Sequence, residues 1–196
     1  MADSETYAHL EHLRLIGEYS RSETADGYLA LAPRFFDHIK TGIELGYTPD
    51  TIAEGRKYVT ELGLDKPVQD VEAAIEELKK RGAKKVAVTG YCWGGTISWL
   101  AATRLKPDAV SAYYGGGIHG TKNEKATVPT QMHFGDKDMH IPMAHVNELR
   151  KLHPDVEIFD YPADHGFHCD ERGSYDAAAS KQAMARTLEF FGKHVG

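Results

Sequence analysis

A cysteine between glycines is the residue best placed to do chemistry in this chain. Cys92 is the centre of the pentapeptide Gly90–Gly94 (GYCWG). Val86–Thr89 before it is apolar and β-branched and predicts a buried strand, whereas Gly95–Ala102 after it predicts a helix. A strand, a G-x-nucleophile-x-G turn and a helix form a nucleophile elbow, whose glycines let strand and helix approach closely. The positive end of the helix favours the reactive thiolate form of Cys92.

A nucleophile of this kind needs a carboxylate and a histidine, and both follow predicted strands later in the chain. Asp138 lies in the loop after Thr130–Phe134, and His165 lies in the loop after Val156–Tyr161. Open α/β sheets carry their sites at the carboxyl ends of the strands. The order Cys92, Asp138, His165 therefore predicts a catalytic triad.

Neighbouring side chains offer alternatives for two of these roles. His168 could act as the base in place of His165, and Asp136 or Asp164 could supply the carboxylate. The base must reach the nucleophile by a hydrogen bond, so a separation above about 8 Å from Cys92 would exclude His165.

The elements that position these residues alternate between strands and helices. Strands are predicted at 28–32, 85–89, 109–114, 130–134 and 156–161, and helices at 49–62, 67–81, 142–152 and 174–194. This alternation predicts an α/β fold with a mostly parallel sheet of about five strands flanked by helices. Residues 1–196 are expected to form a single domain.

Several motifs give the chain a family resemblance. The stretch from Gly27 to the C-terminus resembles the dienelactone hydrolase family, which comprises carboxymethylenebutenolidase-like α/β-hydrolases. The matching segments are Gly27–Pro33, Gly90–Gly95, Tyr113–Gly116, the Gly135-x-x-Asp138-x-x-x-Pro142 loop, His165–Phe167 and Tyr175–Ala178. The resemblance implies a Cys-His-Asp hydrolase that acts on esters or lactones, and no cofactor is expected. It points to Cys92, Asp138 and His165 as the triad and to the backbone N–H of Trp93 as an oxyanion donor.

The resemblance also implies where a small-molecule ester or lactone substrate binds. Two positions at which family members use arginines match His38 and Cys169 here, so these two are the predicted substrate-binding residues. Arg34 and Arg172 lie nearby in the sequence.

The start of the chain departs from the family pattern. Family members place three strands before the segment equivalent to Gly27–Pro33, but here residues 1–26 carry apolar side chains at every third position between Tyr7 and Tyr19. That spacing predicts a helix. The fold is therefore expected to be truncated at its N-terminus, with Tyr28–Ala32 pairing directly with Lys85–Thr89. This direct pairing is expected within a homodimer, and strand exchange between the two copies is the alternative.

Composition argues against several other functions. The net charge is −6 and no basic stripe is present, which argues against binding nucleic acid. The chain lacks an apolar stretch long enough for a membrane span, and a catalytic thiol suits the cytoplasm. The eleven histidines lack the paired spacing of a zinc site, so no metal is expected, and His133 is interpreted as a core residue of its strand.

Two other classes of protein remain open. A glutaminase-like domain also carries a cysteine elbow, but it lacks the Gly-x-x-Asp-x-x-x-Pro loop followed by His165–Phe167. The other alternative is a non-catalytic binding or interaction protein, a hydrolase fold that lost its N-terminal third. Hydrolysis of a simple aryl ester would separate that protein from an enzyme.

Overall fold

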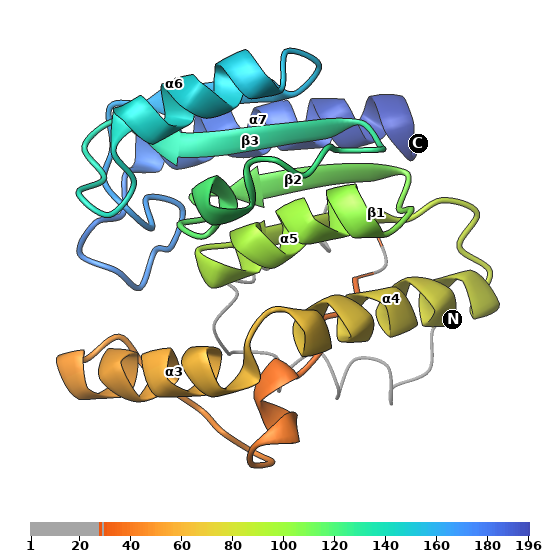
Figure 1. The fold of residues 1–196 in the computed structure, drawn as a ribbon, viewed down its shortest axis with the longest axis horizontal. Coiled ribbons are helices and arrows are strands. Elements are labelled where there is room, and N and C mark those ends of the chain that lie inside the picture. The colour runs from red at the N-terminus through yellow and green to blue at the C-terminus, as the bar shows by residue number, and fades with distance from the viewer. Residues whose placement is uncertain (1–27, 29) are drawn as a thin grey trace.

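A parallel sheet of four strands forms the centre of the fold (Figure 1). The computed structural model describes residue 28 and residues 30–196. The strands are β1 (Ala87–Tyr91), β2 (Ala109–Tyr113), β3 (Thr130–Gly135) and β4 (Glu157–Tyr161), in the spatial order β1-β2-β3-β4. All three strand pairs are parallel. The carboxyl ends of the strands therefore lie together, as the sequence predicted.

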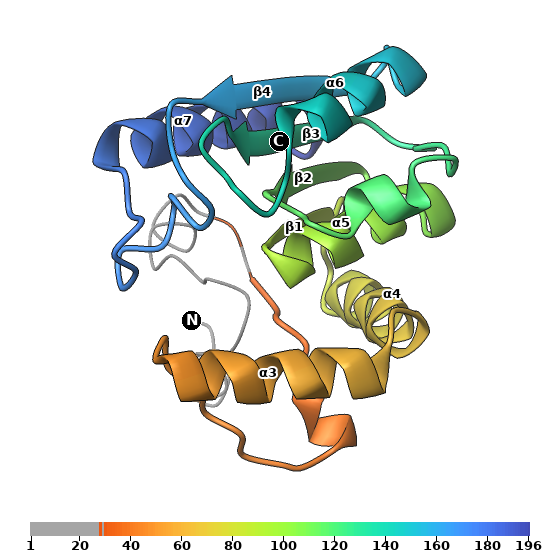
Figure 2. The same cartoon turned by 60° about the vertical axis from the view of Figure 1, so that its left-hand side comes forward.

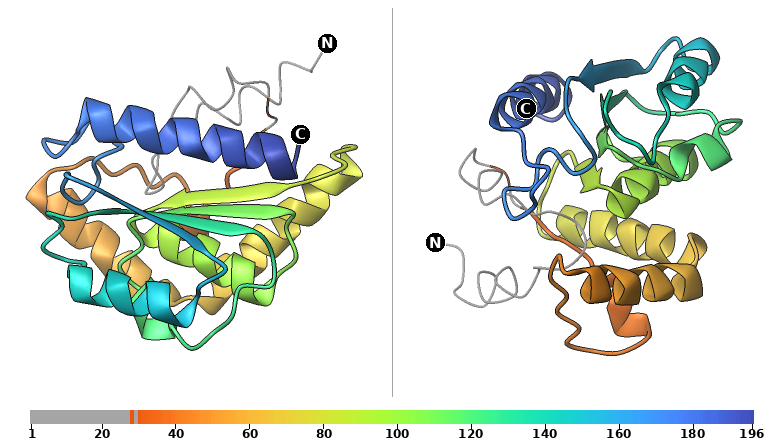
Figure 3. Two further views of the ribbon diagram at one scale, coloured as in Figure 1. Left: turned by 90° about the horizontal axis from the view of Figure 1, so that it is seen from above. Right: turned by 90° about the vertical axis from the view of Figure 1, so that its left-hand side faces the viewer.

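Helices cover both faces of this sheet. The helices of the described residues are α3 (Pro49–Leu62), α4 (Asp65–Lys80), α5 (Trp93–Arg104), α6 (Met143–Leu152) and α7 (Ala177–His194), with the short 3-10 helices η1 (Phe35–His38) and η2 (Ile118–Thr121). Helix α7 lies on one face, and α5 and α6 lie on the other (Figure 3). The predicted α/β fold is confirmed, and the predicted helices differ from the observed ones by only a few residues at their ends.

Helix α3 and η1 lie to one side of the sheet (Figure 2). Their apolar side chains form a small cluster around Phe36, Ile43 and Leu62, separate from the main core. The ring of Phe36 stacks on the ring of Trp93 with centroids 5.9 Å apart, and Phe35 meets the same indole edge-on at 5.6 Å. This unit therefore contacts the first residue of α5 directly.

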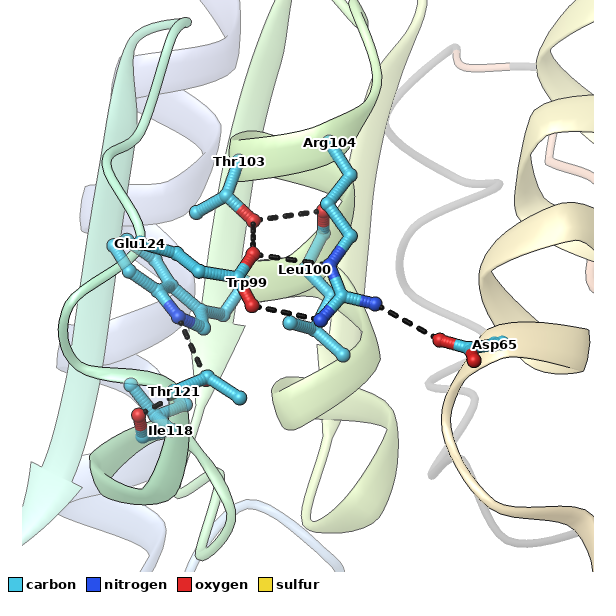
Figure 4. Close-up of polar contacts among 8 residues, drawn as sticks. All are labelled: Asp65, Trp99, Leu100, Thr103, Arg104, Ile118, Thr121 and Glu124. Atoms are coloured by element: carbon cyan, nitrogen blue, oxygen red, sulfur yellow. Dashed lines mark hydrogen bonds and ion pairs between the residues drawn. The ribbon is translucent and has the colours of Figure 1, made fainter.

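Helix α5 has more buried residues than any other helix of the described chain, and polar contacts of its side chains hold it in place. Arg104 donates two hydrogen bonds to Glu124, at 3.0 and 2.7 Å, and one to Asp65 at the start of α4 (Figure 4). The indole N–H of Trp99, which is fully buried, donates to Thr121 Oγ1 at 3.1 Å. These bonds join α5 to α4 and to the segment around η2.

A buried polar cluster joins α7 to the sheet. Thr187 Oγ1 lies 2.6 Å from the hydroxyl of Tyr113, 3.0 Å from Ser111 Oγ and 3.2 Å from His133 Nε2. His133 is fully buried and its Nδ1 lies 2.8 Å from the hydroxyl of Tyr161. Burial lowers the pKa of His133 to about 3, so the ring is neutral. His133 is therefore a hydrogen-bonded core residue, as its place in a strand predicted.

Replacing Thr187 with valine should destabilise the protein by about 1–3 kcal/mol, because it keeps the shape but leaves buried partners unsatisfied. Thr60→Val is the matched control. Thr60 is exposed on α3 and donates only to Arg56 O, so this change should cost less than about 0.5 kcal/mol. Urea unfolding of the two variants measures the difference. Equal stabilities would contradict the importance of the Thr187 contacts.

The predicted fifth strand at Tyr28–Ala32 is wrong. Residues 28 and 30–32 belong to no strand, so they do not pair with Lys85–Thr89 as predicted, and the sheet has four strands within the described residues. This segment and β1 line the same cavity, and within the described residues β1 pairs only with β2. Strand β1 also runs two residues further than predicted, to Tyr91. The helix predicted within residues 1–26 lies outside the described residues.

Candidate active site

Cys92 lies on a strained turn between β1 and α5. Its backbone angles are φ 53° and ψ −118°, and a positive φ is unusual for a residue other than glycine. Hydrogen bonds hold the turn on both sides: the Cys92 N–H donates to Tyr113 O at 3.0 Å, and the Thr96 N–H donates to Cys92 O at 3.2 Å. Strain of this kind is found at functional sites, where the surrounding structure maintains it.

Two glycines make this turn possible. A Cβ at Gly90 would lie 2.3 Å from the carbonyl oxygen of Gly94, and one at Gly95 would lie 2.2 Å from the carbonyl oxygen of Tyr113. Side chains at these positions would push α5 away from β1 and β2. The glycines predicted for a nucleophile elbow are therefore required by close backbone contacts.

Three predicted residues meet in a chain of hydrogen bonds above this turn. His165 Nε2 lies 3.1 Å from Cys92 Sγ, and His165 Nδ1 lies 2.7 Å from Asp138 Oδ2. The Asp138 side chain is fully buried and the His165 side chain is 11% exposed, so bulk water has little access to their contact. The separation between His165 and Cys92 is well below the 8 Å limit set from the sequence.

The alternative residues make other contacts. His168 is buried, and its Nδ1 lies 2.8 Å from Ser180 Oγ of α7. Asp136 is exposed, and Asp164 accepts a hydrogen bond from the backbone N–H of His165. The structure therefore brings together His165 and Asp138 rather than their neighbours.

Further residues support the histidine and the carboxylate, and sequence reasoning missed them. The His140 N–H donates to Asp138 Oδ1 at 2.8 Å, and the Ser174 hydroxyl donates to His165 O at 2.6 Å. The ring of Tyr114 packs edge-on against the His165 ring at 5.2 Å. Tyr114 directly follows β2. Its position at the carboxyl end of a strand could have identified it as a neighbour of the site.

Electrostatics favour a charged pair between His165 and Asp138. Burial alone would lower the pKa of His165, but hydrogen bonds to Asp138 and Cys92 outweigh it and raise that pKa to about 9. For Asp138, burial acts to raise the pKa, whereas the hydrogen bond and charge of His165 lower it below its usual range. At neutral pH the site therefore holds an imidazolium beside a carboxylate.

Trp93 follows Cys92 and begins α5. The first four N–H groups of a helix have no partner within the helix, so the N–H of Trp93 is available to an outside acceptor. The helix dipole adds positive potential at the same point. The position can therefore stabilise an anion formed beside Cys92.

The two predicted substrate-binding residues lie in different surroundings. His38, at the end of η1, is bound to Asp70 of α4, with Nε2 to carboxylate distances of 2.8 and 3.0 Å. Cys169 is buried in the loop after His165, and its backbone N–H donates to Gly166 O. A role for either in binding substrate stays a prediction. Within the described residues, no group of three or more His, Cys, Asp or Glu side chains is arranged to hold a metal ion.

Comparison with known proteins identifies the family. The sequence model of the dienelactone hydrolase family matches residues 10–195. The chain belongs to this family. A Synechocystis sp. protein named "Putative carboxymethylenebutenolidase" is 34% identical over 198 residues, which cover 92% of this chain and 79% of the relative. A Yersinia pestis protein of the same name is 31% identical over 204 residues, which cover 94% of this chain and 73% of the relative.

Solved structures support the same membership. The crystal structure titled "Putative Dienelactone Hydrolase" from Klebsiella pneumoniae matches with a TM-score of 0.76 and 28% identity, covering 93% of this chain and 81% of that chain. A dienelactone hydrolase-like promiscuous phosphotriesterase from metagenomic libraries matches with a TM-score of 0.64 and 20% identity, covering 92% of this chain and 83% of that chain. This match shows a shared fold. The chain thus has an α/β-hydrolase-like fold and is a hydrolase of the dienelactone hydrolase type.

Proposed function

We propose that this family member hydrolyses carboxylic esters or lactones, with Cys92 as nucleophile, His165 as acid and base, and Asp138 as the residue that orients His165. The observation that carries the proposal is the hydrogen-bonded chain from Cys92 Sγ through His165 to Asp138 Oδ2, with links of 3.1 and 2.7 Å. The raised pKa of His165, about 9, favours an imidazolium beside the Cys92 sulfur at neutral pH, placed to donate a proton to the leaving group.

The reaction follows from these positions. The Cys92 thiolate attacks the carbonyl carbon, a carbon–sulfur bond forms, and the N–H of Trp93 stabilises the oxyanion. The carbon–oxygen bond to the leaving group then breaks, and His165 gives its proton to the departing oxygen. A thiol ester remains on Cys92. His165 takes a proton from water, the resulting hydroxide attacks the thiol ester, and the acid and the thiolate are released.

A thiolate nucleophile restricts the substrates. A thiolate is a better leaving group than an alkoxide, so the first tetrahedral intermediate of an alkyl ester reverts rather than proceeds. Enol and aryl esters, and enol lactones, release a stabilised oxyanion and are the expected substrates. The relatives named carboxymethylenebutenolidase support a lactone of this kind as the substrate here.

A panel of substrates tests the proposed function. The purified chain should hydrolyse a p-nitrophenyl ester and a five-membered enol lactone, and should leave a simple alkyl ester and a peptide amide intact. Binding of the lactone without turnover would instead support the non-catalytic alternative. Homodimer formation, the absence of nucleic-acid binding and a cytoplasmic location stay predictions. No helix in the described part of the chain has the length and apolar character that a membrane crossing requires.

The ionisation of His165 should be visible in solution. Its pKa of about 9 in the folded protein lies above the value of about 6.5 in an unfolded chain. Folding therefore stabilises the imidazolium, and this contribution is fully present below pH 6.5 and disappears as the pH rises through 9. An NMR titration of the histidine rings, assigned with His165→Gln, should show one ring titrating near pH 9. Titration of the His165 ring at or below pH 6.5 would contradict the charged pair.

A further inference from the structure

His165 lies in a loop rather than in a helix or strand. The loop, residues 162–176, connects the end of β4 to the start of α7. The His165 ring must nevertheless stay within hydrogen-bond reach of Cys92 Sγ, from which its Nε2 lies 3.1 Å. Asp138 orients the ring through Nδ1, 2.7 Å away. The backbone that carries the ring needs other contacts to hold it in place.

The second half of this loop folds back onto the backbone at His165. The Ser174 hydroxyl donates to His165 O. Two successive turns lie between these residues: the Cys169 N–H donates to Gly166 O at 3.0 Å, and the Arg172 N–H donates to Cys169 O at 3.2 Å. The turns bring the Arg172 side chain against Gly166, the residue that directly follows His165.

Gly166 leaves the space that the Arg172 side chain occupies. Its φ is 75°, in the left-handed region that favours glycine. A Cβ at this position would lie 2.6 Å from Arg172 Nη1 and 2.9 Å from Arg172 Cζ. The guanidinium therefore packs directly on the backbone beside His165, and removing it would leave that backbone without its neighbour.

A second contact of Arg172 reaches the unit formed by η1 and α3. Its guanidinium carbon lies 5.5 Å from the centre of the Tyr47 ring, within cation–π distance. Tyr47 lies two residues before α3 begins, and the loop after β4 lies beside the start of α3 (Figures 1 and 2). The same unit stacks Phe36 on Trp93, the residue after Cys92. The unit thus contacts the chain beside the nucleophile and, through Arg172, the chain beside the histidine.

We propose that Arg172 is a positioning residue for the hydrolysis, and that by linking Gly166 to the Tyr47 ring it holds His165 within reach of Cys92. The proposal rests on the proposed function, which gives His165 the transfer of protons. Arg172 acts through the backbone of Gly166 and transfers no proton itself, because a guanidinium stays charged in proteins. A planar guanidinium also packs on an aromatic face in a way that an ammonium does not.

Kinetics of Arg172→Met test the proposal. Methionine keeps an unbranched side chain but has no guanidinium. A misplacement of about 1 Å can cost about a hundredfold in rate, so kcat for a p-nitrophenyl ester should fall about tenfold to a hundredfold. KM should change by less than about twofold, because the ester does not bind to Arg172. Arg56→Met, at an exposed arginine of α3, is the matched control and should keep the native kcat and KM.

Two results of this experiment would overturn the proposal. A higher KM at unchanged kcat would show that Arg172 binds the substrate. Native values of both constants would show that the reaction does not depend on Arg172. If the methionine variant unfolds, Arg172→Lys replaces it: lysine keeps the charge but lacks the planar group, so the same fall in kcat is expected.

Variants of Tyr47 test the link to α3. Tyr47→Leu should lower kcat as Arg172→Met does, and the double variant should lower it no further, because both changes break one contact. Tyr47→Phe keeps the aromatic face and should recover most of the activity that Tyr47→Leu loses. Native kcat in Tyr47→Leu, or losses that add fully in the double variant, would contradict the link.

NMR separates this proposal from the proposed function, because it needs no turnover. The ring resonances of His165, assigned with His165→Gln, should shift in Arg172→Lys and stay in place in Arg56→Met. Unchanged resonances in Arg172→Lys would overturn the positioning role even in an active hydrolase. A native chain without esterase activity, in which these resonances do shift, would contradict the proposed function while supporting the hold of Arg172 on His165.

Discussion

Replacing Cys92 with alanine should reduce kcat/KM for a p-nitrophenyl ester by at least about a thousandfold, because the variant has no atom that can form the covalent bond to the acyl group. Cys92 Sγ is the sulfur that contacts His165, at 3.1 Å. The melting temperature should change little, since alanine fits the same turn with a smaller side chain. Steady-state kinetics and a thermal melt check both statements.

Retention of activity in Cys92→Ala would show that another group attacks the ester. In that case the contact between Cys92 and His165 would have a structural role, and the proposed mechanism would be wrong. Loss of activity together with loss of the folded state would be resolved by Cys92→Ser, which preserves polarity and size at the same position.

Replacing Asp138 with asparagine should lower kcat/KM by about a hundredfold to ten-thousandfold, because an amide cannot stabilise the imidazolium and can hold the wrong tautomer of His165. The Asp138 carboxylate contacts His165 Nδ1 at 2.7 Å and accepts from the His140 N–H at 2.8 Å. The pKa of His165 should fall in the same variant, because its hydrogen bond to Asp138 is among the contacts that raise it.

Asp136→Asn is the matched control for this change. Asp136 lies two residues earlier in the same loop and is exposed, whereas Asp138 is buried. The control should retain the activity of the native protein and its pH dependence. If the two variants lose activity equally, the loop as a whole matters, and the specific role of Asp138 is contradicted.

The positions of Cys92, Asp138 and His165 could be predicted because each follows a strand whose sequence is distinctive. Residues 130–134 and 156–161 are short apolar runs bounded by turn residues, and Val86–Thr89 leads into a glycine turn. In a parallel sheet, residues after strand ends meet at one edge without any further information. Local pattern and topology together were therefore enough to bring the three side chains near one another.

The segment at Tyr28–Ala32 shows where this reasoning fails. Its apolar residues have the pattern of a buried strand, but a strand exists only when a neighbouring backbone completes its hydrogen bonds. This segment and β1 line a cavity of about 410 Å³ instead of pairing with each other, and no local pattern reports that arrangement. The contact of Tyr114 with His165 was missed for the same reason, because it joins segments distant in sequence. The contacts that His140 makes with Asp138 and Ser174 with His165 are local, but they depend on how each loop folds, which an apolar pattern does not report.

The measurement that tests the central claim most directly is the mass of the enzyme during turnover. A p-nitrophenyl ester with a slowly hydrolysed acyl group is mixed with the native chain, and the reaction is quenched with acid at successive times. The account predicts a burst of nitrophenolate, a mass increase of one acyl group mapped to Cys92, and release of that group by hydroxylamine, as expected for a thiol ester. An acyl group on another residue, or sustained hydrolysis with Cys92 unmodified throughout, would contradict it.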